Sequence, residues 1–173
     1  MSTISMRRDG HFNGYRTTTL VAALALATGV GAFQSDAAAA GPFDAFAGSA
    51  RGGGEVIARD GGRERITCRV NSAVSQGGQA LTQSMVCASD NYRLDIRASA
   101  VAEGDRVSGQ WQETTRGVQG SLAGRVSGGQ FNGAVNGDGF GAAFSVRAAG
   151  RREVYTLRPN AGDISSVSVV LTR

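Results

Sequence analysis

RITCRVNSAVSQGGQALTQSMVC, residues 65–87, consists of two runs of alternating apolar and polar residues joined by Gly77-Gly78. Alternation with a period of two is typical of a β-strand with one buried face, and a glycine pair between two such runs indicates a hairpin turn. A two-residue turn at this glycine pair sets Cys68 directly opposite Cys87 on the apolar face. The stretch therefore predicts a β-hairpin with one cross-strand disulfide, at a hydrogen-bonded pair whose Cα atoms lie about 5.5 Å apart.

The same pattern continues along the chain. From Gly52 onward, short alternating runs are separated by glycines every eight to twelve residues, and no stretch carries a helical apolar stripe of useful length. We count about ten such runs, which predict an all-β domain. The expected fold is a small antiparallel up-and-down β-barrel of about 8–10 strands, with a two-sheet β-sandwich as the alternative.

Two further glycine-containing turns extend the register. The pairs that follow from turns at Glu103-Gly104 and Gly128-Gly129 are Ile96–Trp111 and Val126–Phe131. Gly109, Gly124, Gly133 and Ala142 fall on inward positions, and we expect them to leave space beside Trp111. The tight turns collect at one end of the barrel and the longer, more polar loops at the other. Because binding residues are often carried by loops, we expect a ligand to enter at the end with the longer loops.

Residues 1–40 have the features of a signal peptide. Arg7, Arg8 and Arg16 form a positive region, Leu20–Phe33 is apolar and uncharged, and Ala38–Ala40 offers small residues for cleavage. The apolar stretch is too short to span a bilayer comfortably, so we expect no transmembrane segment in the mature chain. Cleavage after residue 40 leaves a lead-in at 41–51 and a barrel domain at 52–173, in a periplasmic or secreted protein.

Charge and residue types exclude several classes of function. The 18 basic residues, all arginine, are interleaved with 14 acidic ones, and only Arg63–Arg69 and Arg151-Arg152 form local groups. A nucleic-acid surface needs denser positive charge with interleaved aromatic residues, so we expect no nucleic-acid partner. The only histidine, His11, lies in the leader, which excludes Ser–His and Cys–His catalysis from the mature chain. The two cysteines lack the spacing of a zinc site, and we expect no metal, no cofactor and a monomer.

Three residues are candidates for ligand binding: Trp111, Glu113 and Tyr92. Glu113 alternates inward on the strand of Trp111, near the end with the longer loops, and Tyr92 lies at the same level on the neighbouring strand. An inward carboxylate there could act as an acid or base with a raised pKa, or hold a ligand amine; the alternative is a rim residue in water or bonded to Tyr92 or an arginine. Trp111 is either a ligand platform or a core residue. No second inward carboxylate is evident, which argues against a glycosidase, and we assign no catalytic residue.

Several short motifs resemble a family of uncharacterised exported, periplasmic proteins of alphaproteobacteria. The matching stretches are Arg65–Arg69, Met85–Ser89 with Tyr92, Gly109–Glu113 and Ile164–Ser168. The resemblance covers most of the mature chain and implies the export and the β-structure but no particular activity. The chain departs from the family at Ala47–Arg51, where Ser49-Ala50 follows Gly48 in place of a tryptophan. The Gly-x-Trp strand also resembles lipocalin-like and avidin-like barrels.

The function expected from these features is binding of a small or envelope-derived molecule by an exported barrel that is not an enzyme. The first alternative is a structural or interaction protein of the cell envelope without a ligand pocket. The second is a hydrolase-type enzyme that uses Glu113.

Overall fold

A computed structural model describes residues 40–173, which fold as ten antiparallel strands preceded by one short 3-10 helix. The signal peptide expected at residues 1–40 lies, apart from Ala40, outside the described residues. The elements are η1 (Asp44–Phe46), β1 (Gly48–Ala58), β2 (Arg63–Ser75), β3 (Ala80–Ala88), β4 (Arg93–Glu103), β5 (Arg106–Glu113), β6 (Val118–Ser127), β7 (Gln130–Gly137), β8 (Phe140–Ala149), β9 (Arg152–Pro159) and β10 (Ile164–Thr172). The expected all-β fold is confirmed. Strand β1 begins at Gly48, four residues before the domain boundary expected at residue 52.

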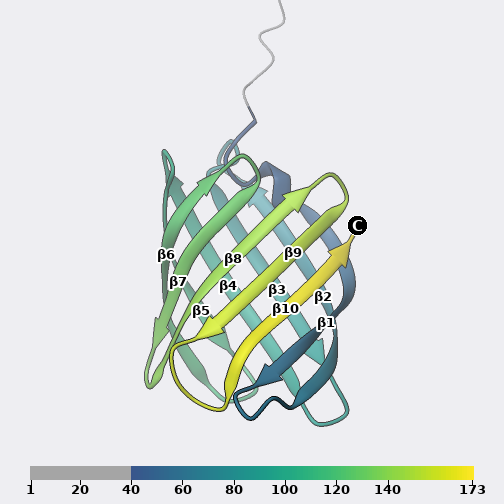
Figure 1. Ribbon diagram of the computed structural model, residues 1–173. Coiled ribbons are helices and arrows are strands. Elements are labelled where there is room, and N and C mark those ends of the chain that lie inside the picture. The colour runs from purple at the N-terminus through teal and green to yellow at the C-terminus, as the bar shows by residue number, and fades with distance from the viewer. Residues whose placement is uncertain (1–39) are drawn as a thin grey trace, which may run out of the picture. The chain divides into compact units, whose positions relative to one another are not determined.

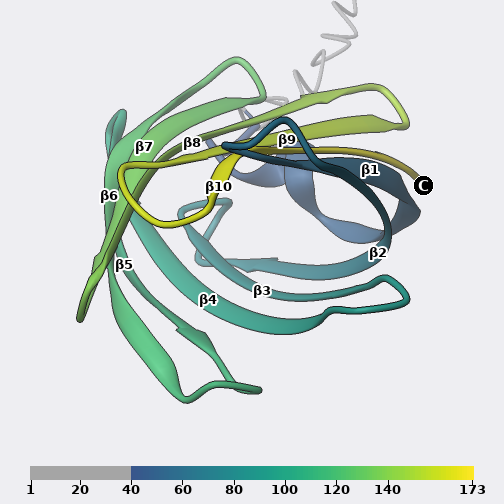
Figure 2. The same cartoon turned by 60° about the horizontal axis from the view of Figure 1, so that its bottom comes forward.

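The strands form a closed up-and-down barrel (Figures 1 and 2). Each strand pairs with the next one along the chain, and β1 pairs with β10 to close the sheet. Closure leaves no unpaired sheet edge, so the β-sandwich alternative is wrong. Within residues 40–173 there is no helix long and apolar enough to cross a lipid bilayer.

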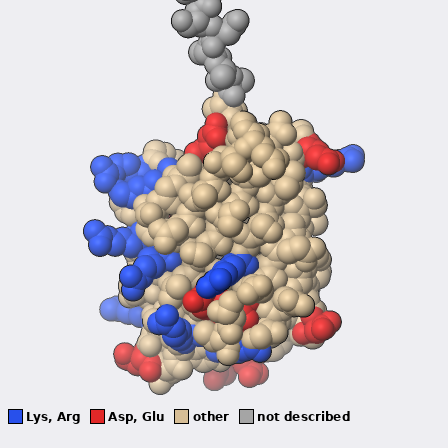
Figure 3. All heavy atoms as spheres, turned by 180° about the vertical axis from the view of Figure 1, so that it is seen from behind, with Lys and Arg blue, Asp and Glu red and all other residues tan. Residues whose placement is uncertain are grey.

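Alternation of apolar and polar residues decides which side chains face inward. In β2, residues Ile66, Cys68, Val70 and Ser72 are buried and their neighbours are exposed. The outer wall carries arginines and acidic residues, as the blue and red spheres of Figure 3 show. One face of each strand is therefore in the core and the other in water, as antiparallel sheets allow.

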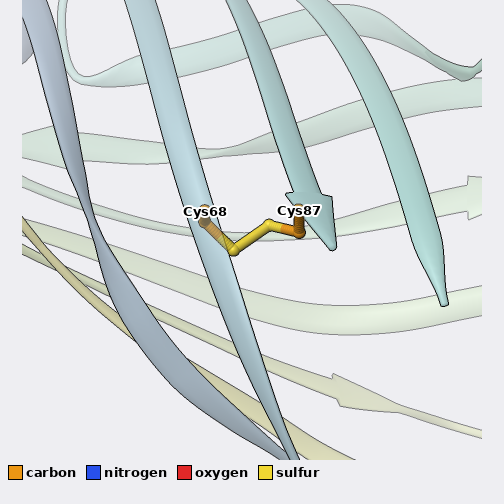
Figure 4. The surroundings of a disulfide bond; sticks show 2 residues. All are labelled: Cys68 and Cys87. Atoms are coloured by element: carbon orange, nitrogen blue, oxygen red, sulfur yellow. A yellow bond between two sulfur atoms is a disulfide. The ribbon is translucent and has the colours of Figure 1, made fainter. Parts of the chain in front are cut away.

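The hairpin between β2 and β3 has the expected register but a longer loop. Cys68 lies opposite Cys87, while the loop spans residues 76–79, with positive φ angles at Gln76, Gly77 and Gly78. Adding one loop residue on each side keeps the pairing but exchanges hydrogen-bonded with non-hydrogen-bonded pairs. The Cys68 and Cys87 Cα atoms are 4.1 Å apart, as in a non-hydrogen-bonded pair, so the expected hydrogen-bonded site is wrong. The disulfide itself is confirmed and points into the barrel between β2 and β3 (Figure 4).

The other two expected turns have different outcomes. The Gly128-Gly129 turn is confirmed, with Val126 opposite Phe131. Between β4 and β5, however, the turn is Gly104-Asp105, and Trp111 lies opposite Ala98 rather than Ile96. Gly104 has a φ of 63° and stands at the first central position of the turn, where glycine supplies the positive φ at little steric expense.

One end of the barrel is closed by the residues that precede β1. We call residues 41–47, which include η1, the cover segment. It lies at the end of the tight turns, at the top of Figure 1, and the Phe43 amide donates to the Gly78 carbonyl at 3.0 Å. Phe43 and Phe46 are both buried and join a core cluster with Phe131. The chain between the expected cleavage point and the barrel is therefore part of the core.

Candidate functional site

On β4, β6, β7, β9 and β10, inward side chains become more exposed toward the end of the barrel that lacks a cover, whereas on β2 and β3 the disulfide cysteines near that end are buried. Along β4, Ala102 is buried and Leu94 is partly exposed; along β6, Val126 is buried and Val118 is partly exposed. We call the partly exposed apolar side chains that face inward at this open end the mouth lining: Val56, Leu94, Ile96, Trp111, Val118, Val135, Phe140, Phe144, Leu157 and Val167. Figure 2 turns this end toward the viewer. The open end of the barrel interior is thus apolar, and it is accessible on the side away from the disulfide.

Trp111 belongs to the mouth lining and rests against two glycines. It lies opposite Gly120, which in turn lies opposite Gly137. A side chain on Gly137 would come within 3.0 Å of the Trp111 Cζ2 atom, so the indole needs this glycine. The indole Nε1 donates to the Ser121 carbonyl at 3.1 Å, and the ring stacks edge to face on Phe140 with centroids 5.7 Å apart. These contacts fix the orientation of the indole and give its N–H the hydrogen-bond partner that a buried tryptophan usually has.

The glycines expected to leave space beside Trp111 have another role. A Cβ atom on Gly109, Gly124 or Gly133 would lie between 2.1 and 2.3 Å from a backbone oxygen of the neighbouring strand. Backbones therefore approach too closely there for any side chain, which allows the strands to bend around a narrow barrel. The expectation of open volume at these three positions is wrong. At Gly120 a Cβ atom would likewise lie 1.8 Å from the Asn136 oxygen, and only at Gly137 does the indole itself lie against the Cβ position.

Glu113 is held by the turn that follows it. Glu113 is 6% exposed, and its carboxylate accepts hydrogen bonds from the amides of Asp95 (3.1 Å), Thr115 (3.0 Å) and Arg116 (2.9 Å), and from the Thr115 hydroxyl. Burial alone would raise the pKa of this carboxyl, but the hydrogen bonds outweigh it and lower the pKa to about 2. This geometry therefore does not support the expected role of Glu113 as an acid or base with a raised pKa. The carboxylate instead fixes the loop between β5 and β6.

Arg116 connects Glu113 to Tyr92. Its guanidinium lies 3.5 Å from the Glu113 carboxylate and 5.0 Å from the centre of the Tyr92 ring, which is a cation–π contact. Tyr92 is 48% exposed, so it lies at the rim. The structure thus brings Tyr92 and Glu113 together through an arginine that sequence reasoning did not single out. Trp111 lies one inward position deeper on β5.

A small cavity lies inside the barrel, beneath the mouth lining. Its volume is about 60 Å³, and its walls are Phe46, Leu81, Gln83, Ala98, Ala100, Leu122, Phe131, Phe144 and Val146. Gln83 is the single polar residue among these nine. An apolar space of this size can stay empty or receive the end of a narrow apolar ligand.

A chain of buried and partly buried polar groups leads from this cavity to the covered end. The Gln83 amide donates to the Ser72 hydroxyl at 2.9 Å and to the Tyr155 hydroxyl at 3.1 Å. Tyr155 in turn donates to Glu153 at 2.7 Å, and Arg173 donates to the same carboxylate. Burial and the adjacent Glu153 carboxylate raise the pKa of Tyr155 well above its usual value, so this hydroxyl stays protonated.

Glu153 corrects the expectation that Glu113 is the only evident inward carboxylate. It is 1% exposed and occupies an inward position at the start of β9. The alternation of Glu153 with Tyr155 and Leu157 is the sequence signal from which its inward position could have been predicted. However, Glu153 lies beside the covered end and Glu113 at the open end. The two carboxylates do not form the close pair that glycoside hydrolysis uses.

A shallow depression marks the outer wall beside Trp111. Its volume is about 550 Å³, and it lies between the β5–β6 and β7–β8 hairpins. Its polar lining consists of Gln110, Gln119, Ser121, Asn136 and Asp138, all exposed. Trp111, Gly120 and Gly137 line the depression as well. Among residues 40–173, no group of three histidine, cysteine, aspartate or glutamate side chains could hold a metal ion.

Comparison with known proteins supports the fold and gives no information about the function. No protein-family model matches the chain, and no curated protein matches it in sequence. Among solved structures, the protein is similar to Rv2717c from M. tuberculosis, with a TM-score of 0.61 and 16% sequence identity. The match covers 75% of this chain and 93% of Rv2717c. At this identity the similarity concerns the barrel fold alone.

Proposed function

We propose that this protein is an exported barrel that binds a small or envelope-derived molecule of apolar character through its open end. The observation that carries the proposal is the partly exposed apolar mouth lining at the end of the barrel opposite the cover segment, on the strands away from the disulfide. Apolar side chains left accessible inside a concave wall are typical of ligand sites. Tyr92 and Arg116 at the rim then offer polar contacts to a ligand whose apolar part lies inside.

The direction of entry follows from the two ends of the barrel. The cover segment places buried Phe43 and Phe46 across the end with the tight turns. A ligand therefore has access from the other end, past Trp111 and Val118. The disulfide supports a periplasmic or secreted location, because such bonds persist in oxidising compartments.

A matched pair of variants on β6 tests the proposal. Val118→Arg places a charge in the mouth lining, whereas Ala123→Arg places the same charge on the exposed outer wall of that strand. The probe is N-phenyl-1-naphthylamine, an uncharged apolar dye whose emission rises in apolar surroundings. We expect the parent and Ala123→Arg proteins to bind the dye alike and Val118→Arg to bind it at least about tenfold more weakly. Equal binding by all three proteins, or none by any, contradicts the proposal, provided that melting curves show all three folded.

One observation favours the alternative of a structural or interaction protein. The cavity beneath the mouth lining measures only about 60 Å³, much less than the several hundred Å³ typical of sites that enclose a drug-sized ligand. Native mass spectrometry of protein purified from its own periplasm discriminates the two functions. A retained small molecule favours binding, and a bare mass together with failure to bind the dye favours the structural role.

A further inference from the structure

The amide nitrogen of Gly41 lies 2.7 Å from the Asp44 carboxylate, to which it donates a hydrogen bond. Gly41 also packs tightly against the β2–β3 loop: a Cβ atom at this position would lie 2.4 Å from the Gly77 oxygen and the Gly78 Cα atom. A glycine is therefore required where the cover segment begins. Ala40, directly before it, is exposed.

We infer that removal of the leader after Ala40 creates an α-ammonium group that forms an ion pair with Asp44 and so stabilises the cover segment. The inference rests on the proposed export of the chain and goes beyond its proposed ligand. In the cleavage, water adds across the Ala40–Gly41 peptide bond, Ala40 leaves with the new carboxylate, and Gly41 keeps the nitrogen as an amine. An α-amine has an ordinary pKa of about 7.7–8.0, so it is mostly protonated at neutral pH. The nitrogen that donates as a neutral amide before cleavage then donates as a cation.

The consequence follows from the strength of the two kinds of hydrogen bond. A bond between a cation and a carboxylate is shorter and roughly twice as strong as one with a neutral donor. Phe43 and Phe46 belong to the segment that Asp44 anchors, and both are buried. A more stable cover segment therefore also holds these two rings more firmly in the core. A second charged group also contacts the segment: Arg173 donates to the Ala45 carbonyl and is paired with Glu153.

Proteins with defined N-termini test the inference independently of export. Protein 41–173 carries its amine on Gly41, whereas protein 40–173 carries it on Ala40 and keeps a neutral amide at Gly41. All ten strands lie within residues 48–172, so both proteins retain the whole barrel. We expect 41–173 to melt about 2–4 °C higher than 40–173 at pH 7. We also expect the Phe43 amide to exchange with solvent about two- to five-fold more slowly in 41–173.

Two controls separate the ion pair from a length effect. Asp44→Asn should abolish the difference between the two proteins, whereas Asp138→Asn at the open end should leave it unchanged. Pairing raises the folded-state pKa of the amine, so the difference should be present below about pH 8 and be lost as the pH rises through that folded-state value. Equal melting temperatures at pH 7, or a difference that persists in Asp44→Asn, overturns the inference. N-terminal sequencing of the exported protein should begin at Gly41, and a start at another residue overturns it as well.

Discussion

Arg173 forms an ion pair with the Glu153 carboxylate inside the covered end of the barrel, with its Nε 2.9 Å from the Glu153 Oε1. Glu153 also accepts a hydrogen bond from Tyr155, so the carboxylate has a partner for each oxygen. A buried charge is tolerated when it is paired and hydrogen-bonded in this way.

Removing the arginine should therefore be costly. We expect Arg173→Gln to lower the free energy of unfolding by about 3 kcal/mol, because it leaves the Glu153 charge buried without its cation. Urea unfolding at pH 7 measures this. The double variant Glu153→Gln/Arg173→Gln should recover part of the loss. As a control, Arg125→Gln breaks the exposed pair with Asp105 and should change stability by less than about 1 kcal/mol.

Glu113→Gln should destabilise the protein in a way that depends on pH. The folded pKa of Glu113 is about 2, below its ordinary 4.5, so its carboxylate stabilises the fold above pH 4.5 and loses this effect as the pH falls toward 2. We expect a loss of about 1–3 kcal/mol at pH 7, since four hydrogen-bond donors lose a charged acceptor. The difference between the parent and the variant should shrink steadily in urea titrations from pH 5 to pH 2.5. A difference that grows on acidification would contradict the assignment.

Reduction of the disulfide should lower stability without changing the fold. Cys68 and Cys87 are 19 residues apart in sequence, and closing a loop of this length contributes about 3 kcal/mol through the unfolded state. Native protein should show no free thiol, and the reduced protein and the Cys68→Ala/Cys87→Ala double variant should melt at similar, lower temperatures. Thiols that titrate freely in native, unreduced protein would rule out the bond.

Trp111 reports on the open end because it is the only tryptophan of the chain. Its emission should shift to the blue when N-phenyl-1-naphthylamine or a retained ligand fills the mouth lining. Trp111→Phe should keep the fold and weaken dye binding. If Trp111 were only a core residue, the substitution would instead cost a few kcal/mol of stability with dye binding unchanged, in the range for truncating a large buried side chain.

The alternation and the glycine turns were enough to predict an antiparallel all-β fold with the barrel as first choice, because each turn transmits its register to the strands beside it. Closure by β1 and β10 decided between the barrel and the β-sandwich. The β4–β5 turn shows where this reasoning fails. Moving the turn from Glu103-Gly104 to Gly104-Asp105 changes every partner by two positions and leaves every side chain on the same face. The apolar pattern is identical for both registers, so only the φ requirement at Gly104 distinguishes them.

The polar groups inside the barrel were harder to predict for a different reason. Glu153 alternates inward, but its partner Arg173 lies beyond β10, across the hairpin that joins β9 to β10 through residues 160–163. The register of that hairpin cannot be read from a short glycine turn. The cover segment escaped prediction as well, since a three-residue helix has no measurable periodicity.

The pairing of β1 with β10 has a consequence for how the chain folds. Of the ten strand pairings in residues 48–172, nine join neighbours along the chain, whereas Arg51 pairs with Thr172 across more than a hundred residues. Closing such a long loop has a large entropic cost that the hairpins avoid. Folding should therefore proceed by zipping of adjacent hairpins into an open, curved sheet, with ring closure last. The Arg173–Ala45 contact spans the same two ends of the chain, so it can form only when the ring is complete.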